Sequence, residues 1–403
     1  MAIIKQLKKY AALYIGVIVI YMAALLLVYA IPNRAVAENV KISQEYLELE
    51  GDNPLYIFFS PASRTDNYSD KIIYEEVLKE DDHGILYNAM DNQDYARYWH
   101  GHSVYMRPLS VFFNILQIRY VLMAVFYGLV LLTLYNSYRR FGLRVAIPLA
   151  VGFLMIYPNT VSTCLQLAAI FLVTMIFSNI IIRTYDAKPE RIGRIIFLCG
   201  SVANFFDLLT IPLLSFGIPL IFVLLMNKDA IKDQFLLMVR LGIAWVLGYG
   251  GTWAAKWIIG TVVLHRSVIA DALNTVAYRI DGKEDWFDIN YPNMYRSNIT
   301  NILPPLPMAL NIAILAALVV VAVVLLVRSS AARARMKELC LLPVAALAPY
   351  AWYTVVLNHS CIHAFFTYRL QLITLVALGV CFAEIICAYR KETAHESIDV
   401  ANH

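Results

Sequence analysis

Long uninterrupted runs of apolar residues limit what this chain can fold into more than any other feature of its sequence. A helix needs about 17–25 apolar residues to cross the hydrocarbon core of a bilayer. Seven runs are long enough: 11–31, 118–136, 163–182, 241–263, 306–327, 339–357 and 370–388. Apolar residues make up 60% of the chain and charged residues only 15%, whereas soluble proteins have roughly 45–50% and 25%. The sequence therefore predicts an all-α polytopic membrane protein and excludes the soluble and disordered classes.

Three shorter apolar runs, 145–157, 195–206 and 211–226, are interrupted or bounded by prolines and by Asp207. Because proline and buried charge both disfavour a regular span, we interpret these runs as short or broken spans. We therefore expect about ten transmembrane helices in a single integral membrane domain that covers residues 1–403. The first run is longer than the 7–15 apolar residues of a typical signal peptide, so we expect it to be retained.

The basic residues indicate how these spans are oriented. With ten spans, 19 of the 33 Lys and Arg residues fall on the side that holds both ends of the chain. They are Lys5, Lys8, Lys9, Arg139, Arg140, Arg144, Arg183, Lys188, Arg191, Arg194, Lys228, Lys232, Arg240, Arg328, Arg333, Arg335, Lys337, Arg390 and Lys391. Since basic loops stay inside, we expect both termini to be cytoplasmic. Two long loops, 32–117 and 264–305, then lie on the outer face.

The first outer loop, 32–117, is rich in polar residues. It contains fourteen acidic residues, a short amphipathic pattern at 70–80 and an apolar segment at 108–117 that we expect in the membrane interface. Long loops on a compact scaffold usually serve a function, and this one is too aromatic to be disordered. Four polar clusters lie on the outer side: residues 64–70, 91–109, 204–207 and 358–369.

Asp91, Asp94 and Arg97 recur every three residues, so in a helix they would share one face. A carboxylate on such a face can act as a general base, and Asp94 is our first candidate. The alternative is a solvated helix with an internal ion pair. Asp66 and Asp70 form a similar pair, for which a polar turn or a helix cap is the stronger interpretation.

The second cluster also places cations among aromatic rings. Arg97, His100, His102 and Arg107 are candidates for binding phosphate oxygens, because arginine in particular offers two parallel N–H groups. The aromatic residues beside them either stack on a sugar or form a belt at the membrane interface. These residues are Tyr95, Tyr98 and Trp99.

Other polar residues lie inside or beside the apolar runs. Asp207 interrupts an apolar hairpin, where it either has a function or marks the turn. Lys256 would face a wet cavity or extend to the interface, and Arg369 would meet an anion or extend in the same way. His359 and His363 have the i, i+4 spacing of a metal-binding pair, but no HExxH motif or nearby acid accompanies them. We therefore expect no metal site and no cofactor.

Two motifs resemble those of a known family. Residues 94–109 contain an Asp-x-x-Arg pair, then Gly101 and an Arg-Pro-Leu run, and residues 204–212 read NFFDLLTIP. Both are similar to runs in O-antigen glucosyltransferases of the bacteriophage-conversion type. Those enzymes belong to the GT-C superfamily of membrane glycosyltransferases, which use polyprenyl-phosphate-linked sugars. One position differs, since Gln93 precedes Asp94 where the family has two adjacent acids, and Asp91 is the candidate for the second acid.

The resemblance implies an inverting glycosyltransferase that moves a sugar from a polyprenyl-phosphate donor to a cell-surface glycan or lipid acceptor. The donor would reach an outer-face site sideways from the bilayer, and arginines would stabilise the phosphate leaving group. The partners would be that donor, that acceptor and membrane lipids, with no nucleic acid and no metal. The expected catalytic residues are Asp94, Asp91 and Asp207, the phosphate-binding residues Arg97, Arg107, Arg369, His359 and His363, and the sugar-binding residues Tyr98, Trp99, His100 and Asn204.

Two other functions stay open at this point. A flippase or other transporter of a lipid-linked sugar would also have many spans, but transporters often have two related halves with matching broken helices. No internal repeat is visible in this sequence. An outer-face acyltransferase or phosphotransferase would need a nucleophile or a metal-binding set, and the sequence identifies neither.

Overall fold

The computed structural model describes the backbone of residues 2–57, 59–79 and 83–401, and the side chains in these ranges except those of 2–7, 281 and 395–401. The protein is 81% helical, and no strand forms in the described part of the chain. The prediction of an all-α fold is therefore confirmed.

Six helical segments within the described ranges are long and apolar enough to cross a bilayer. Five are single helices: α1 (Ala2–Tyr29), α6 (Ile115–Phe141), α9 (Leu165–Thr184), α12 (Ile231–Leu264) and α15 (Met308–Arg328). The sixth, Ala364–Ala394, comprises α20 (Ala364–Thr367), the 3₁₀ turn η4 (Tyr368–Gln371) and most of α21 (Leu372–Ala401). A further candidate is bent by 57° after α16 (Ser330–Glu338). This is the fold of an all-α membrane protein, and the number of ten spans stays a prediction.

The three shorter apolar runs also form helices: α7 (Leu143–Met155), α10 (Ile192–Phe206) and α11 (Leu214–Met226). A helix rises about 1.5 Å per residue, so each is roughly 20 Å long and shorter than the hydrocarbon core of about 30 Å. Gly248 lets α10 approach α12 closely, because a Cβ there would lie 2.0 Å from the Phe197 carbonyl oxygen.

Two expected segments differ from the structure. The run 339–357 is not one helix but α17 (Leu341–Ala346) and α18 (Ala348–Val355), followed by α19 (Leu357–Ile362). Pro349 explains the first break, because it lacks the N–H that a continuous helix needs. The pattern at 70–80 forms α3 (Asn67–Val77), which starts earlier because Asp66 caps it; residue 80 lies outside the described residues.

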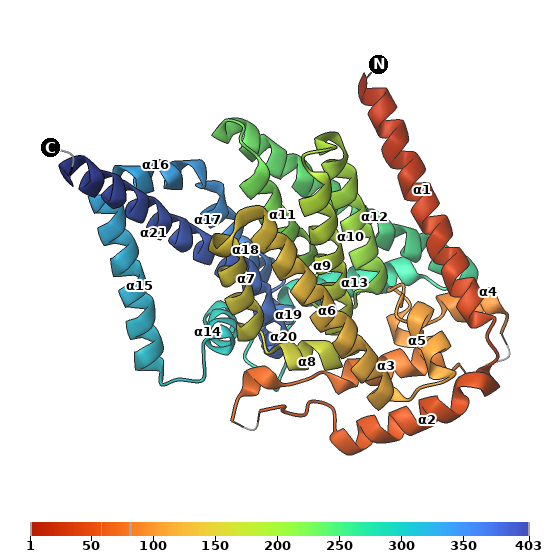
Figure 1. Ribbon diagram of the computed structural model, residues 1–403. Coiled ribbons are helices and arrows are strands. Elements are labelled where there is room, and N and C mark those ends of the chain that lie inside the picture. The colour runs from red at the N-terminus through yellow and green to blue at the C-terminus, as the bar shows by residue number, and fades with distance from the viewer. Residues whose placement is uncertain (1, 58, 80–82, 402–403) are drawn as a thin grey trace.

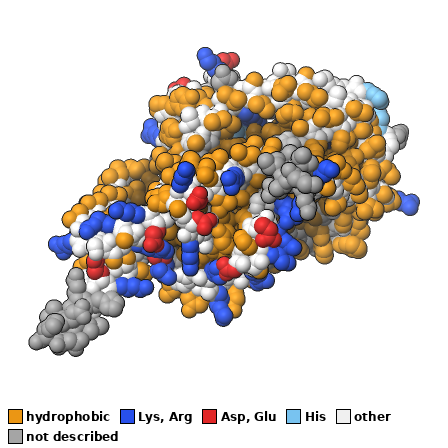
Figure 2. All heavy atoms as spheres, turned by 90° about the horizontal axis from the view of Figure 1, so that it is seen from above, with side chains coloured by type: hydrophobic (Ala, Val, Ile, Leu, Met, Phe, Trp, Pro, Cys, Tyr) orange, Lys and Arg blue, Asp and Glu red, His pale blue; other side chains and the backbone are white. Residues whose placement is uncertain are grey.

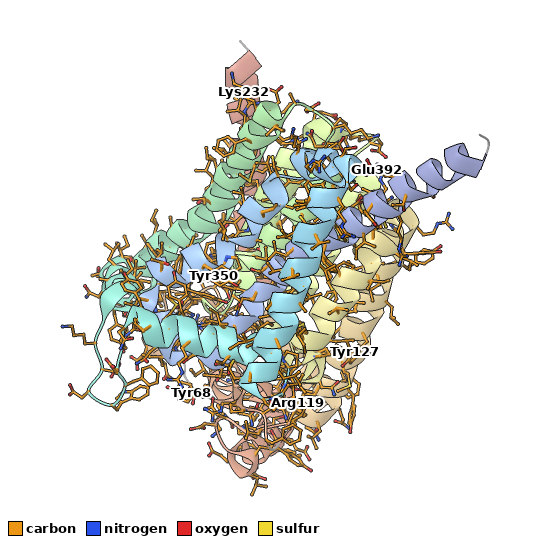
Figure 3. All side chains as sticks on the ribbon, turned by 90° about the vertical axis from the view of Figure 1, so that its left-hand side faces the viewer. Tyr68, Arg119, Tyr127, Lys232, Tyr350 and Glu392 are labelled. Atoms are coloured by element: carbon orange, nitrogen blue, oxygen red, sulfur yellow. The ribbon has the colours of Figure 1, made fainter. Side chains whose placement is uncertain are left out.

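The helices of the two long loops gather at one end of the molecule, which we call the loop end (Figure 1). Both termini lie at the opposite end, the terminal end, which also holds the 3₁₀ turn η3 (Pro189–Arg191). Figure 3 agrees, with Tyr68 and Arg119 at the loop end and Lys232 and Glu392 at the other. The loop end contains α2 (Asn33–Glu50), η1 (Pro61–Ser63), α3, α4 (Ile85–Met90), η2 (Gln93–Tyr95), α5 (Ser103–Ser110), α8 (Pro158–Thr163), α13 (Val268–Asp281) and α14 (Tyr291–Ile302).

The surface differs along the molecule in a way that suits a bilayer. Figure 2 looks onto the terminal end, where Lys and Arg side chains gather among apolar ones. Between the ends, α15 stands apart from most of the other helices (Figure 1). Asn311 is its one buried residue, and its valines and leucines are exposed. Lipid tails are the environment in which such a helix is stable.

Candidate functional site

Three of the four predicted polar clusters meet at the loop end. Residues 91–109 contact residues 204–207 where the Gly101 N–H donates to the Phe205 carbonyl at 2.9 Å. A Cβ at Gly101 would lie 2.5 Å from that carbonyl, so only glycine fits. Residues 358–369 join through His359, whose ring lies beside the backbone of residues 209–210. Together with α12 and α13 they form what we call the loop-end site: Asp94, Arg97, Tyr98, Asn204, Asp207, Tyr249, Asp271, Arg279, His359 and His363.

Arg97 of the loop-end site is held in place by several neighbouring side chains. Its guanidinium carbon lies 5.0 Å from the ring centroids of both Tyr95 and Tyr98, and Nη1 lies 3.2 Å from an Asp271 carboxylate oxygen. The Trp253 and Trp257 indoles donate to its backbone carbonyl at 2.9 and 3.1 Å. Although Arg97 is only 8% exposed, its Nε–H has no partner in the described part of the chain. The side chain is thus fixed in place, with one buried donor that no group among the described residues satisfies.

Arg279 of α13 provides a second guanidinium. Its Nη1 donates to His363 Nε2 at 2.9 Å, and its Nε–H, like that of Arg97, is unpaired within the described ranges. Both guanidinium groups lie close enough to Tyr98 for their charges to act on its hydroxyl. Two guanidinium groups therefore act electrostatically on the same tyrosine, and together they suit an anion with several oxygens.

The acids at 91–94 do not share a helix face with Arg97, as the spacing had suggested. The segment forms the 3₁₀ turn η2, and Gln93 has a φ of 46°. Asp91 instead pairs with Arg266 at 2.7 Å. Asp94 is exposed, and its backbone carbonyl accepts a hydrogen bond from Arg97. The turn therefore brings Asp94 next to the Arg97 guanidinium and leaves its carboxylate facing solvent.

Asp207 is buried beneath this turn, with 1% of its surface exposed. One carboxylate oxygen accepts from the Thr210 N–H at 2.8 Å, and the other accepts from the Tyr249 hydroxyl at 2.7 Å. Burial raises the pKa of Asp207 to about 6. Nearby, Asn204 is 2% exposed and its Oδ1 has no partner among the described residues.

The raised pKa of Asp207 predicts a pH effect on stability. The carboxyl titrates near 3.8 in the unfolded chain and near 6 in the fold, so the folded protein holds the extra proton and loses stability as the pH rises through this window. Asp207→Asn removes that loss, and its stability relative to the wild type should rise by about 2 kcal/mol from pH 4 to pH 7. Thermal unfolding in detergent measures this, with Asp186→Asn at the terminal end as the control. A constant difference across that range would contradict the prediction.

Burial keeps the histidines uncharged. It lowers the pKa of His102 to about 3 and that of His100 and His359 well below the usual value. The His363 pKa is lowered to about 3 by burial and by Arg279. His359 and His363 are therefore neutral in this site; His363 bonds to Arg279, and neither ring nitrogen of His359 has a partner among the described residues. No three His, Cys, Asp or Glu side chains among the described residues are grouped to hold a metal ion.

Two arginines that we expected to bind phosphate donate their side-chain N–H groups to backbone carbonyls of the protein. Arg369 is fully buried and donates to the carbonyls of Ile156, Phe365 and Ala62 at 3.0, 2.9 and 3.2 Å. Arg107 donates to the backbone carbonyls of Val28, Val77 and Ile31. These carbonyls lie at or near the ends of helices and turns, where donors from outside the helix complete their hydrogen bonding. The geometry therefore favours a structural role for both side chains.

Substituting Arg369 should lower stability and not merely donor binding. Arg369→Gln removes three hydrogen bonds to buried carbonyls, two of which keep only the Tyr368 hydroxyl as a side-chain donor, and hydrogen bonds to charged groups are worth about 1.5–3 kcal/mol each. We expect the free energy of unfolding in detergent to fall by at least about 3 kcal/mol, with Arg266→Gln, a change at an exposed arginine, as the control. A variant that is as stable as the wild type but binds donor weakly would return Arg369 to the site.

Trp99 and Lys256 also differ from the expectation. Trp99 is fully buried and donates to the Thr252 carbonyl at 2.8 Å, so its ring is not free to stack on a sugar. Lys256 is buried too, and its Nζ donates to the Met90 carbonyl at 2.8 Å. It therefore neither faces water nor extends to the interface. Tyr98 is 3% exposed and stacks on Trp253, at 5.9 Å between centroids.

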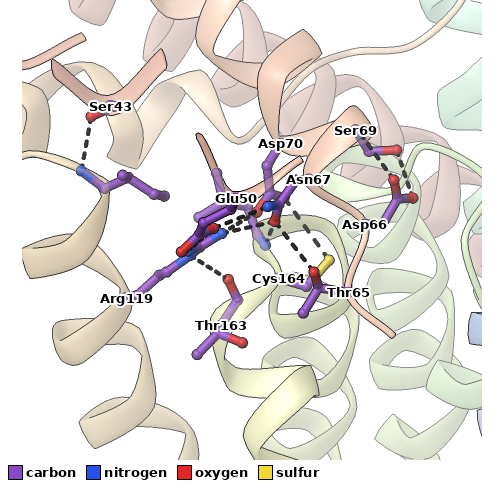
Figure 4. Close-up of polar contacts among 12 residues, drawn as sticks. Ser43, Glu50, Thr65, Asp66, Asn67, Ser69, Asp70, Arg119, Thr163 and Cys164 are labelled. Atoms are coloured by element: carbon purple, nitrogen blue, oxygen red, sulfur yellow. Dashed lines mark hydrogen bonds and ion pairs between the residues drawn. The ribbon is translucent and has the colours of Figure 1, made fainter. Parts of the chain in front are cut away.

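The remaining cluster, residues 64–70, forms a polar network beside the loop-end site (Figure 4). Asp66 caps α3, as the alternative interpretation held, by accepting from the Ser69 N–H at 3.1 Å. Arg119 binds both Glu50 oxygens at 2.8 and 3.0 Å and donates to Asn67 at 2.9 Å. Asp70 is fully buried, 3.7 Å from the same guanidinium. This network fixes α2 and α3 to α6.

Several residues in or beside the loop-end site were not predicted from the sequence. Tyr249 belongs to an aromatic series at every fourth position of α12 (residues 245, 249, 253 and 257), a pattern that the sequence does display. Asp271 and Arg279 lie on α13 in the second long loop, where no motif marks them. Gln166 lies inside an apolar run and has no sequence signal beyond its polarity.

No family model, curated protein or solved structure matches this chain.

Proposed function

We propose that the protein is an inverting membrane glycosyltransferase, which moves a sugar from a polyprenyl-phosphate donor to a glycan or lipid acceptor. The observation that carries this proposal is that the charges of Arg97 and Arg279 both act on Tyr98. Each has an unpaired Nε–H within the described ranges, and Arg97 lies next to the exposed acid Asp94. A phosphate leaving group needs cations and an acceptor hydroxyl needs a base, and the loop-end site offers both.

The phosphate role falls to Arg97 and Arg279. Arg107 and Arg369 have their donors engaged by backbone carbonyls. As the bond between the sugar C1 and the phosphate oxygen breaks, negative charge grows on that phosphate. Two fixed guanidinium groups stabilise this charge more in the transition state than in the bound donor, which is the condition for faster chemistry.

The base role falls to Asp94. An acceptor that arrives from water meets this exposed carboxylate before the buried parts of the site. Asp94 takes the proton of the attacking hydroxyl, the hydroxyl oxygen bonds to C1, and polyprenyl phosphate leaves as a stable anion, so no general acid is required. Asp207 has both oxygens engaged by Thr210 and Tyr249 and serves to position them.

We place the loop end on the outer face of a bacterial cytoplasmic membrane, with both termini in the cytoplasm. The gathering of Lys and Arg at the terminal end supports this orientation. The donor tail would then lie along apolar side chains of the spans while its phosphate meets the loop-end site. The similarity of residues 94–109 and 204–212 to motifs of lipid-linked-sugar glycosyltransferases supports the same substrate class.

Mass spectrometry of cell-surface glycans, in cells with and without the gene, tests this proposal. We expect one sugar residue to disappear with the gene and to return with the wild-type copy but not with Asp94→Asn. Identical glycans in all strains would reject the proposal.

A further inference from the structure

Gln166 connects the first loop to the loop-end site, although it lies in none of the four polar clusters. It is 2% exposed at the start of α9. Its Nε2 donates to an Asp66 carboxylate oxygen, and its Oε1 accepts from the Thr210 hydroxyl at 2.8 Å. Both ends of one amide are therefore used to join α3 to the turn between α10 and α11.

The contacts continue from Thr210 to Arg97. The Thr210 N–H donates to Asp207, which accepts in turn from the Tyr249 hydroxyl. The Tyr249 ring packs edge-on against Trp253, at 5.8 Å between centroids, and the Trp253 indole donates to the Arg97 carbonyl at 2.9 Å. A series of contacts thus runs from Asp66 to the backbone of Arg97, the residue that we assign to the donor phosphate.

The turn that Gln166 holds is strained. Leu209 has a φ of 66°, a left-handed conformation that costs a residue other than glycine about 1–3 kcal/mol and persists only when its surroundings enforce it. Here the Asp207–Thr210 hydrogen bond closes the turn, and Gln166 holds the Thr210 side chain. His359 lies against the backbone of the same turn. Without Gln166 the turn is free to relax and to carry Asp207 and His359 with it.

We propose that Gln166 is a positioning residue for the transfer reaction, which holds the Leu209 turn and, through Asp207, Tyr249 and Trp253, the backbone of Arg97 from which the guanidinium extends. This inference rests on the proposed function. The direction of the hydrogen bond between Gln166 and Asp66 matters, because Asp66 already accepts from the Ser69 N–H and hydroxyl. The carboxylate must accept from the amide, and this direction leaves the amide oxygen free for Thr210.

Exchanging the hydrogen-bond donor and acceptor between positions 66 and 166 tests the inference. Gln166→Glu sets two carboxylates against each other, and we expect kcat to fall roughly 10²-fold with the donor KM changed by less than about twofold. Combining Gln166→Glu with Asp66→Asn lets the new amide donate to the new carboxylate, so kcat should recover to within about threefold of the wild type. Thr210→Val, which removes the other bond and keeps the shape, should also lower kcat. The assay uses polyprenyl-phosphate hexoses labelled in the sugar.

Gln234→Glu is the matched control, because Gln234 is 6% exposed and donates to the Asp229 carbonyl in the terminal half of the protein. It should lower the melting temperature without changing kcat. The inference is overturned if the double variant transfers no faster than Gln166→Glu, or if Thr210→Val keeps the wild-type kcat. If the wild-type protein itself transfers no sugar, the proposed function is rejected before the role of Gln166 is tested. Failure of the proposed function can therefore be distinguished from failure of this inference.

Discussion

Replacing Asp94 with asparagine is expected to lower the rate of sugar transfer by roughly 10²- to 10⁴-fold, the usual contribution of a general base. The amide has the shape of the carboxylate but cannot take the proton of the acceptor hydroxyl. Folding should be unaffected, since the Asp94 side chain is exposed and Arg97 contacts its backbone carbonyl. The measurement is kcat for purified protein with labelled donor, together with thermal unfolding in detergent.

Asp91→Asn serves as the control for this variant. It changes an acid three residues away whose partner is Arg266, on the rim of the site. We expect its kcat to stay within about threefold of the wild type. Full activity of Asp94→Asn would remove Asp94 from the mechanism and direct attention to Asp66 or Asp207.

Arg97→Lys is expected to have the second largest effect, a loss in kcat/KM of roughly 10²- to 10³-fold, comparable to the removal of one donor from an oxyanion site. Lysine keeps the charge but lacks the planar fork and the Nε–H, which has no partner among the described residues. It also loses the stacking between Tyr95 and Tyr98. Steady-state kinetics across donor concentrations measure the loss.

The guanidinium of Arg279 allows a second test of whether both arginines bind one phosphate. Arg279→Lys should have a similar effect, and the double variant should lose less than the product of the two, because both groups act on one phosphate. Arg266→Lys, on the rim, is the control and should change kcat/KM little. Independent, multiplicative losses, or an unchanged kcat/KM in Arg97→Lys, would contradict a shared phosphate site.

The fold was predictable where local physics decides it. Apolar runs are enough to predict an all-α membrane protein, and Asp66 is a helix cap as its residue type favours. The shared helix face considered for Asp91, Asp94 and Arg97 does not form, because their spacing does not reveal that Gln93 adopts a left-handed conformation and starts a 3₁₀ turn.

The functions of the charged residues were less predictable, because their partners come from distant segments. Arg369 was expected to meet an anion or to extend to the interface. Its partners are carbonyls that include Ala62, more than 300 residues away in sequence, and no local pattern indicates them. Arg279, in contrast, lies in the loop-end site although we did not expect it there. It resembles an ordinary charge on an amphipathic helix, and only the fold brings it near Arg97 and Tyr98.

The most direct test of the central claim uses purified protein in proteoliposomes, with polyprenyl-phosphate hexoses labelled in the sugar. The acceptor is the cell-surface glycan of a strain that lacks the gene. We predict that label moves to the glycan, that one molecule of free polyprenyl phosphate appears per sugar transferred, and that neither occurs with Asp94→Asn. If the donor instead crosses the bilayer intact, with no free polyprenyl phosphate and no labelled glycan, the protein is a transporter of the lipid-linked sugar and the account is contradicted.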